Sequence, residues 1–343
     1  MTTKTLSLLL GAGMFFLLPA ARAAADDTEA VTVDPDTAAV IAGGLRYLAH
    51  EQQANGSWSN AIGRNGYPVA MTGYALMAMM SAGNLPEEGP YKQNVAAGMR
   101  YLLEEVQPPG LFRDVDKGKY MYSHGIGTLA LAEMYGETQS PVLRERLTQL
   151  VQQIVAGQSQ AGGWRYEPNA RDSDVSVTVP QLAALRAAQN AGIAVPQGTI
   201  DRALDFLRLC ADDNSGEFYY QPGRQPGFAC TAAAIYSLQL CGEYDDPRVK
   251  RGSDFLVAQN ERQGQWWAYG NYYAAPAQYM IGGATWRQWY PQIRDELMKN
   301  VTRQGGEAFW NDRHSQGLGP VYETAVFLTI LALPYHYLPL YQR

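Results

Sequence analysis

Two kinds of helical segment alternate along the chain. The first kind has one charged and one apolar face, as in 44–48, 98–102 and, more loosely, 203–207. The second kind is almost free of charge and rich in small residues, and its six members are 71–82, 125–133, 177–188, 228–240, 273–283 and 321–333. A helix that is apolar all round is buried, whereas an amphipathic helix covers a surface. The pattern therefore predicts inner helices wrapped by outer ones.

A short motif, glutamine followed by Gly-x-Trp or Gly-x-Phe, separates the two kinds of segment. Its copies are centred on Gly56, Gly110, Gly162, Gly216 and Gly264, with a worn sixth copy at 304–310. The copy at Gly216 has Asp212 in place of the glutamine. The spacing of about fifty residues is that of one helix pair with its connections. We expect an all-α fold, an (α/α)6 toroid whose six helix pairs form an inner parallel barrel inside an outer barrel. Strand signals are nearly absent.

The motif itself suits structural glue. A glutamine amide at the end of an outer helix can bond backbone groups at a neighbouring helix terminus. The aromatic ring can cover that contact, and the glycine supplies a turn with positive φ. We expect the loops that follow each motif to lead into the inner helices, so that all six gather at one mouth of the barrel.

The N-terminus has the pattern of a signal peptide. An apolar stretch, 5–20, follows Lys4 and is followed by the small-residue run 21–25, which is too short for a membrane span. We expect a signal peptide over 1–25, a polar tail over 26–35 and the toroid over 36–343. The mature chain would then have no transmembrane segment and would be exported, to the periplasm or the extracellular space.

Composition narrows the partners further. The chain is 46% hydrophobic with a net charge of −6, which suits one globular domain with a large core and disfavours nucleic acid. Three cysteines, Cys210, Cys230 and Cys241, show no metal-ligand spacing. Cys230 and Cys241 lie too far apart on one helix to bridge. Cys210 and Cys230 are either joined or, like Cys241, buried free thiols.

The repeats resemble the QW-type repeat of the squalene cyclase and protein prenyltransferase superfamily. More narrowly, 122–133, 162–166 with 172–178, and 335–341 resemble secreted bacterial proteins of single-toroid length that carry prenyltransferase and squalene oxidase repeats. The resemblance covers essentially all of the mature chain and implies the terpenoid cyclase type of α/α toroid. Protein prenyltransferases hold zinc through Asp, Cys and His, but this chain has no Asp-x-Cys pair, so we expect no metal and no other cofactor.

Aromatic side chains crowd the expected mouth. The tyrosines placed there are Tyr67, Tyr120, Tyr122, Tyr166, Tyr219, Tyr220, Tyr269, Tyr272, Tyr273 and Tyr322. Such rings can stabilise a cation, stack on sugars or contact an apolar ligand, although each ring alone can simply pack a loop against the barrel. The ligand contacts that we expect are Tyr122, Trp164, Tyr166, Tyr272, Tyr273 and Tyr322.

Polar residues at the same mouth are the candidates for catalysis. Asp172 and Asp174 precede the third inner helix, and one of them is expected to cap it. The sequence Asp172-Ser173-Asp174 also resembles the first two acids of the Asp-x-Asp-Asp-Thr-Ala motif of class II terpene cyclases, in which the middle acid protonates an alkene or epoxide. Val175 stands at the third acid position, and those cyclases close their site between two domains.

Two further residues are candidates for supporting that chemistry. His124 opens the second inner helix, where a contact with Asp174 would make a competent acid or base; the alternative is a bond to backbone. Glu323, like Glu133, is a charge on an otherwise apolar inner helix and needs a partner or cavity water.

Two functional hypotheses remain open. The first is a binding or scaffold module that holds a hydrophobic, isoprenoid-like or glycan ligand, or an envelope partner protein, without turnover. The second is an enzyme with Asp174 as general acid, assisted by His124 or Glu323, on an isoprenoid-like or saccharide substrate. A buried Asp174 at the floor of a closed cavity would favour the enzyme, whereas an Asp174 used for capping would favour binding.

Overall fold

A computed structural model describes residues 31–59, 66–113, 119–259, 264, 266–311 and 317–341. The predicted signal peptide over 1–25, and residues 26–30 of the polar tail, lie outside the described residues, so both stay predictions. No helix in the described part of the chain has the length and apolar character needed to cross a bilayer.

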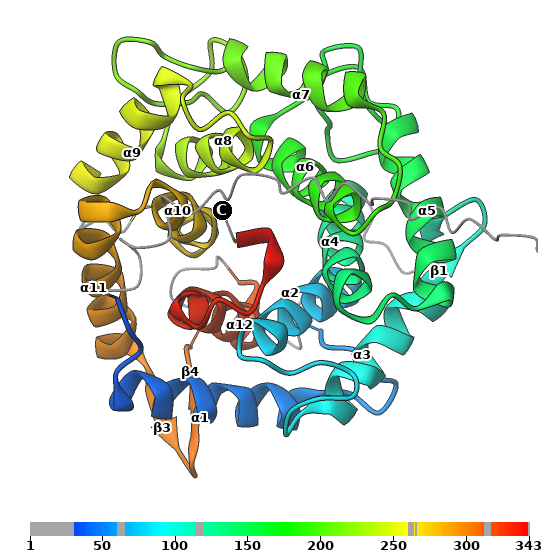
Figure 1. The fold of residues 1–343 in the computed structure, drawn as a ribbon, viewed down its shortest axis with the longest axis vertical. Helices are drawn as coiled ribbons and strands as arrows, with labels where there is room; N and C mark the ends of the chain where they lie inside the picture. The colour runs from blue at the N-terminus through cyan, green and yellow to red at the C-terminus, as the bar shows by residue number, and fades with distance from the viewer. Residues whose placement is uncertain are drawn as a thin grey trace, which may run out of the picture.

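The helices form two concentric rings (Figure 1). The outer helices are α1 (Pro35–Glu51), α3 (Lys92–Glu105), α5 (Pro141–Ala156), α7 (Gln197–Leu209), α9 (Pro247–Gln259) and α11 (Gly283–Asn300). The inner helices are α2 (Pro68–Ser81), α4 (Tyr120–Thr138), α6 (Val175–Asn190), α8 (Phe228–Leu240), α10 (Trp267–Ile281) and α12 (Gly319–Ala332). Outer and inner helices alternate along the chain, so the predicted all-α, (α/α)6 toroid is confirmed.

Small residues let the inner helices approach closely. A Cβ added at Gly73 in α2 would lie 2.8 Å from a methyl carbon of Ile126 in α4. One added at Gly125 in α4 would lie 2.9 Å from Cβ of Pro180 in α6. Contacts shorter than van der Waals distance force a shift of the backbone, so these glycines set the spacing of the inner barrel.

Two short antiparallel hairpins replace plain turns in the second and sixth copies of the motif. They pair β1 (Val106–Gln107) with β2 (Leu111–Phe112), and β3 (Thr302–Gln304) with β4 (Glu307–Phe309). In the second hairpin the turn residues Gly305 and Gly306 have φ of 61° and 85°, as a tight two-residue hairpin turn requires. The scarcity of strand signals in the sequence fits pairs this short.

Glutamine side chains join neighbouring outer helices in the first and third copies. Nε2 of Gln52 donates to the carbonyl oxygens of Gly56 and Asn94, both at 2.9 Å. Nε2 of Gln158 donates in the same way to Gly162 at 2.6 Å and Thr199 at 2.8 Å. In each copy the amide therefore links its own loop to the first turn of the next outer helix.

The tryptophans of the same copies fix the loop to both rings. Trp58 Nε1 donates to the carbonyl of Leu48 at 2.6 Å, and its backbone N–H donates to the hydroxyl of Thr72 at 3.0 Å. The first contact reaches the outer helix and the second reaches the inner helix. The loop glycine completes the motif, because Gly56 has φ of 90° and a Cβ there would lie 2.4 Å from the carbonyl of Ala97. These contacts have the form expected of structural glue.

The fifth copy departs from this arrangement. Trp266 has φ of 66° at the N-cap of α10 and is 45% exposed. The buried ring beside it belongs to Trp267, which packs edge-on against Phe327 with centroids 5.6 Å apart. The expectation that every tryptophan of the motif is glue is therefore wrong for Trp266, because the left-handed backbone turns its side chain out of the core.

The C-terminal segment enters the centre of the ring (Figure 1). Its last turn, η3 (Pro339–Tyr341), buries Leu340 and Tyr341. The backbone N–H of Leu340 donates to Oε2 of Glu133 at 3.3 Å, and the Tyr341 ring lies 6.3 Å from that of Tyr236. Both partners lie toward the C-terminal ends of inner helices, so this segment fills the barrel at the end opposite the mouth.

Candidate functional site

The starts of the six inner helices surround one cavity of about 860 Å³, within the range of small-molecule sites. Its lining includes Met71 and Ile126 together with ten aromatic residues, which are Tyr67, Tyr74, Tyr122, Tyr166, Tyr220, Phe228, Phe255, Trp266, Tyr269 and Tyr322. The charged groups among the described lining residues are Lys119 and Glu217. The cavity is therefore mainly aromatic and apolar.

Three of the six expected ligand contacts face this cavity, namely Tyr122, Tyr166 and Tyr322. Tyr272 and Tyr273 lie behind the lining instead. Tyr272 packs edge-on against Tyr74 with centroids 5.3 Å apart, and Tyr273 packs edge-on against Tyr269 at 5.0 Å. Other tyrosines of the inner barrel cover Tyr272 and Tyr273 in this structure, so the described lining does not support their predicted contact with a ligand, which stays a prediction.

Trp164 is also displaced from the ligand set. Its side chain is 0% exposed, its indole N–H donates to the carbonyl of Ile154 at 2.7 Å, and its backbone N–H donates to Thr178 at 3.0 Å. The ring packs between the two rings of helices and is outside the described lining, so its expected ligand contact stays a prediction that this position does not support.

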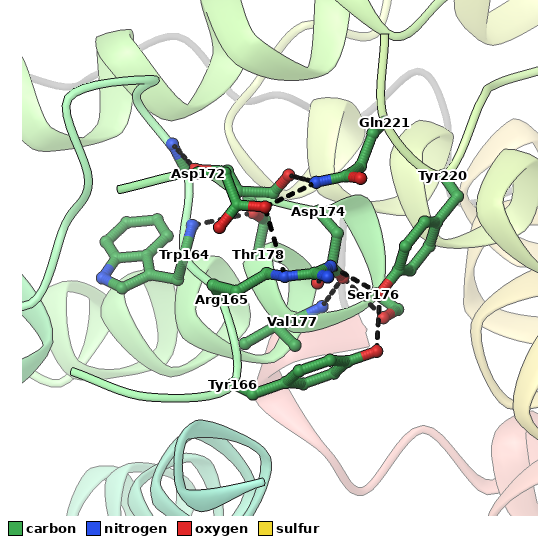
Figure 2. A network of polar contacts seen from close by, with 12 residues as sticks. Trp164, Arg165, Tyr166, Asp172, Asp174, Ser176, Val177, Thr178, Tyr220 and Gln221 are labelled. Carbon is green, nitrogen blue, oxygen red and sulfur yellow. Dashed lines mark hydrogen bonds and ion pairs between the residues drawn. The ribbon is translucent and has the colours of Figure 1, made fainter. Parts of the chain in front are cut away.

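Asp174 caps α6 and is 0% exposed. Its Oδ1 accepts from the backbone N–H of Val177 at 2.9 Å and from the hydroxyl of Ser176 at 2.6 Å. Its Oδ2 pairs with Nη1 of Arg165 at 2.7 Å, as Figure 2 shows. Both carboxylate oxygens are engaged, and the side chain does not belong to the described cavity lining. The capping interpretation accounts for this position.

Asp172 lies on the outer side of the same cluster. Its side chain is well exposed, with Oδ2 3.5 Å from Nε of Arg165 and 3.1 Å from Nε2 of Gln221. Arg165 thus faces two carboxylates. Its guanidinium carbon also lies 4.6 Å from the ring centroid of Tyr166 and 5.5 Å from that of Tyr220, so two lining tyrosines enclose a cation that is already paired.

Hydrogen bonds connect this cluster to the cavity wall. Nη1 of Arg165 donates to the phenol oxygen of Tyr220 at 2.7 Å, and the phenol oxygens of Tyr220 and Tyr166 lie 2.6 Å apart. The Ser176 hydroxyl, which donates to Asp174, is bonded to the phenol of Tyr122. Burial, with further contributions from neighbouring groups, raises the pKa of Tyr122 and of Tyr220, so these phenols keep their protons at neutral pH.

His124 does not join Asp174. Its Nε2 donates to the carbonyl of Leu150 at 3.2 Å, and its Nδ1 lies 3.4 Å from the hydroxyl of Tyr120. Burial lowers the pKa of His124 to about 4, so the ring is neutral at neutral pH. The expected contact with Asp174 is wrong, because both ring nitrogens have partners on the far side of α4, and the alternative of a backbone bond is correct.

The two inner-helix glutamates are buried away from the cavity. Glu323 is 1% exposed on α12 and is not among the described lining residues, although its neighbour Tyr322 is. Glu133 is 4% exposed and accepts from Leu340 N–H. Burial raises the pKa of Glu133 to about 7, so this carboxyl group titrates near neutrality at the closed end of the barrel.

Sequence reasoning missed several parts of the cavity wall. Trp266 and Phe255 line it, as do Tyr74 and Cys230. The adjacent residues Trp266 and Trp267 could have indicated this, because only one of two adjacent indole rings can fill the buried position beside the motif and the other must point elsewhere. Cys210, Cys230 and Cys241 are free thiols in this structure, with Cys210 buried and the other two only partly buried. Within the described ranges no three metal-ligating side chains come together.

Comparison with protein-family models and with curated proteins gives no match. Several solved structures are similar in fold. The type II terpene cyclase MstE from Scytonema, in complex with geranylgeranyl dihydroxybenzoate, superposes with a TM-score of 0.59 over 88% of this chain and 98% of its own, at 13% identity.

Two carbohydrate-active enzymes are as similar. An inactive variant of the α-1,6-mannanase GH76A from Salegentibacter, in complex with α-1,6-mannotriose, has a TM-score of 0.64 at 9% identity over 87% of this chain and 99% of its own. Cellobiose 2-epimerase from Bacillus thermoamylovorans superposes with a TM-score of 0.64 at 16% identity, over 85% of this chain and 96% of its own. Identities this low establish the fold alone, and the chain has the α/α toroid fold that terpenoid cyclase-like proteins share with these enzymes.

Proposed function

We propose that this protein binds a hydrophobic, isoprenoid-like small molecule in the aromatic cavity at the mouth of the inner barrel. The observation that carries the proposal is the cavity of about 860 Å³ with ten aromatic lining residues. Apolar surface removed from water stabilises a complex by about 25 cal/mol per Å², and aromatic walls supply such surface with little loss of side-chain entropy.

The state of Asp174 favours binding over acid catalysis. A general acid has to carry a proton and reach its substrate. Asp174 accepts bonds from Val177 N–H and Ser176, pairs with Arg165, and is fully buried behind the lining. An enzyme that uses Asp174 as its acid would have to break this arrangement, so the binding hypothesis needs fewer changes.

The lining also favours an apolar ligand over a saccharide. Glycoside hydrolysis uses a pair of carboxylic acids that flank the scissile bond. Among the described lining residues Glu217 is the one carboxylic acid. The mannanase and the terpene cyclase share the fold with this chain. The aromatic and aliphatic wall of the cavity fits an isoprenoid-like ligand better than a saccharide. We also propose that the protein is exported and that its signal peptide over 1–25 is removed, on the basis of the apolar stretch at the N-terminus.

A cavity-filling variant tests the proposal. Ala229 is half-buried at the start of α8 and lines the cavity, so Ala229→Trp should occupy the ligand volume. Leu209→Trp is the control, since Leu209 is 69% exposed on the outer ring. Native mass spectrometry and solvent extraction of protein from its own exported fraction should find a bound lipid in the wild type and control and none in Ala229→Trp.

Other results would point elsewhere. A polypeptide that co-purifies in place of a lipid would support an envelope partner protein. Bound sugar would support the carbohydrate alternative. An unchanged lipid load in Ala229→Trp would place the ligand outside this cavity and contradict the proposal.

A further inference from the structure

We infer that the cavity selects a ligand with one neutral oxygen that accepts a hydrogen bond, such as a hydroxyl, carbonyl or ether at one end of an apolar chain, and that the phenol pair Tyr166–Tyr220 donates that bond. The inference rests on the proposed function and names the ligand class of the same site. It is carried by the polar contacts of the phenol pair, which come from the wall beside α6.

A count of protons identifies the donor. Nη1 of Arg165 donates to the oxygen of Tyr220, and the oxygens of Tyr220 and Tyr166 lie 2.6 Å apart. The bond between the two phenols uses one of their two protons, whichever of them donates. The other proton has no acceptor among the described residues. A ligand that fills the cavity removes water from this phenol O–H, and an unpaired polar group away from water is costly, so the ligand has to supply an acceptor.

The phenol of Tyr220 is a donor over the physiological pH range. Burial raises the pKa of Tyr220, and the Arg165 guanidinium opposes this only partly. The oxygen of Tyr220 therefore keeps its proton. A protonated phenol beside a guanidinium suits an electron-rich oxygen on the ligand, which excludes a pure hydrocarbon as the preferred ligand.

The charges behind the pair favour a neutral oxygen over an anion. Arg165 is paired with Asp174 at 2.7 Å and lies 3.5 Å from Asp172, so one guanidinium faces two carboxylates. An anionic head group at the phenols would gain little from Arg165, whose charge is already matched, and would approach two like charges. Lys119 is the one cation of the described lining, and the acid probe below tests whether it attracts an anion. Apolar side chains elsewhere in the lining, such as Met71, Phe255 and Trp266, suit the hydrocarbon part of the ligand.

The experiment compares four probes with one carbon skeleton: geranylgeraniol, its methyl ether, geranylgeranoic acid and the matching hydrocarbon. Their affinities for purified, delipidated protein are measured by displacement of radiolabelled geranylgeraniol at neutral pH. The quantity of interest is the ratio of affinities, alcohol or ether over hydrocarbon, because it cancels differences in probe solubility between variants.

The proton count makes a specific prediction for variants. Tyr166→Phe or Tyr220→Phe alone leaves one phenol with one unshared proton, so each single variant keeps most of the ratio. Tyr166→Phe with Tyr220→Phe removes the donor and should lower the ratio about three- to tenfold, the worth of one hydrogen bond. Tyr219→Phe is the matched control, since Tyr219 lies on the same loop but its hydroxyl donates to Asp212 at 2.9 Å.

Several results would overturn the inference. Tighter binding of the acid than of the alcohol would show an anion site. Equal binding of ether and hydrocarbon to the wild type would show that no donor is used, and this comparison needs no variant to fold. If all four probes bind alike, the selectivity is wrong but the cavity still binds apolar ligands. If none binds, the proposed function fails with it.

Discussion

The carboxylate of Asp174 and the guanidinium of Arg165 form an ion pair at 2.7 Å at the start of α6. This contact joins the loop after the third motif to the inner barrel, while Arg165 lies against the ring faces of Tyr166 and Tyr220. The pair therefore positions one wall of the cavity from behind. The acid at the position most suggestive of catalysis has a supporting role in this structure.

The first prediction concerns Asp174. Asp174→Ala removes the N-cap and leaves Arg165 without its buried partner, so the free energy of unfolding should fall by about 2–3 kcal/mol. Asp174→Asn keeps a capping oxygen and should lose less. Urea unfolding of both variants checks this order. Full stability of Asp174→Ala, with a loss of turnover of a bound isoprenoid, would instead support the acid-catalyst hypothesis.

Two tryptophans of the motif should respond in opposite ways. Trp164→Ala should cost about 3–5 kcal/mol of unfolding free energy, because a fully buried ring leaves a cavity. Trp266→Ala should change stability by less than about 1 kcal/mol and weaken ligand binding severalfold, because the half-exposed ring lines the cavity. Denaturation and ligand titration of each variant separate the two roles. Similar stability losses in both variants would contradict the account of the fifth motif.

His124 should make stability sensitive to acid. Its pKa is lowered to about 4 from an ordinary 6.5, so the unfolded chain binds the proton more readily. The neutral His124 ring contributes about 3 kcal/mol to the free energy of unfolding. This contribution is complete above pH 6.5 and is lost as pH falls toward 4. His124→Gln should lack this part of the decline when unfolding free energies are compared at several pH values. Parallel curves for the two proteins would show that His124 is not buried as described.

Glu133 should have the opposite pH dependence. Its pKa is raised to about 7 from 4.5. The contribution of the protonated Glu133 to the free energy of unfolding is therefore present below pH 4.5 and is lost as pH rises through 7. Relative to the wild type, Glu133→Gln should therefore gain up to about 3 kcal/mol between pH 5 and pH 8. Thermal unfolding across this range checks the gain, with Glu145→Gln, an exposed glutamate on the outer helix α5, as the control. A gain that does not grow with pH would contradict the burial of Glu133.

Much of the fold follows from periodic features of the sequence. The alternation of charged and uncharged segments and the spacing of Gly-x-Trp predict the order and the pairing of the helices. These features are local and recur, so a motif copy that departs from the pattern does not change the prediction for the other helix pairs. The sequence pattern also predicts Tyr122, Tyr166 and Tyr322 at the mouth, because Tyr122 and Tyr322 lie in the first turn of an inner helix and Tyr166 lies in the loop that leads to one.

The rest depends on contacts that no local pattern encodes. Whether His124 faces Asp174 or Leu150 depends on the rotation of α4 about its axis. Tyr272 and Tyr273 are one turn deeper than the lining because α10 starts at Trp267. The position of η3 among the inner helices depends on a contact between Leu340 and Glu133, and these residues are far apart in the sequence.

The central claim is that the aromatic cavity binds an isoprenoid-like ligand. The most direct measurement is a crystal structure of the delipidated protein with geranylgeraniol. The account predicts that the hydrocarbon chain lies in the cavity between Met71, Phe255 and Trp266, with its hydroxyl oxygen within hydrogen-bond distance of Tyr166 or Tyr220. An empty cavity, or a ligand bound on the outer ring of helices, would contradict it.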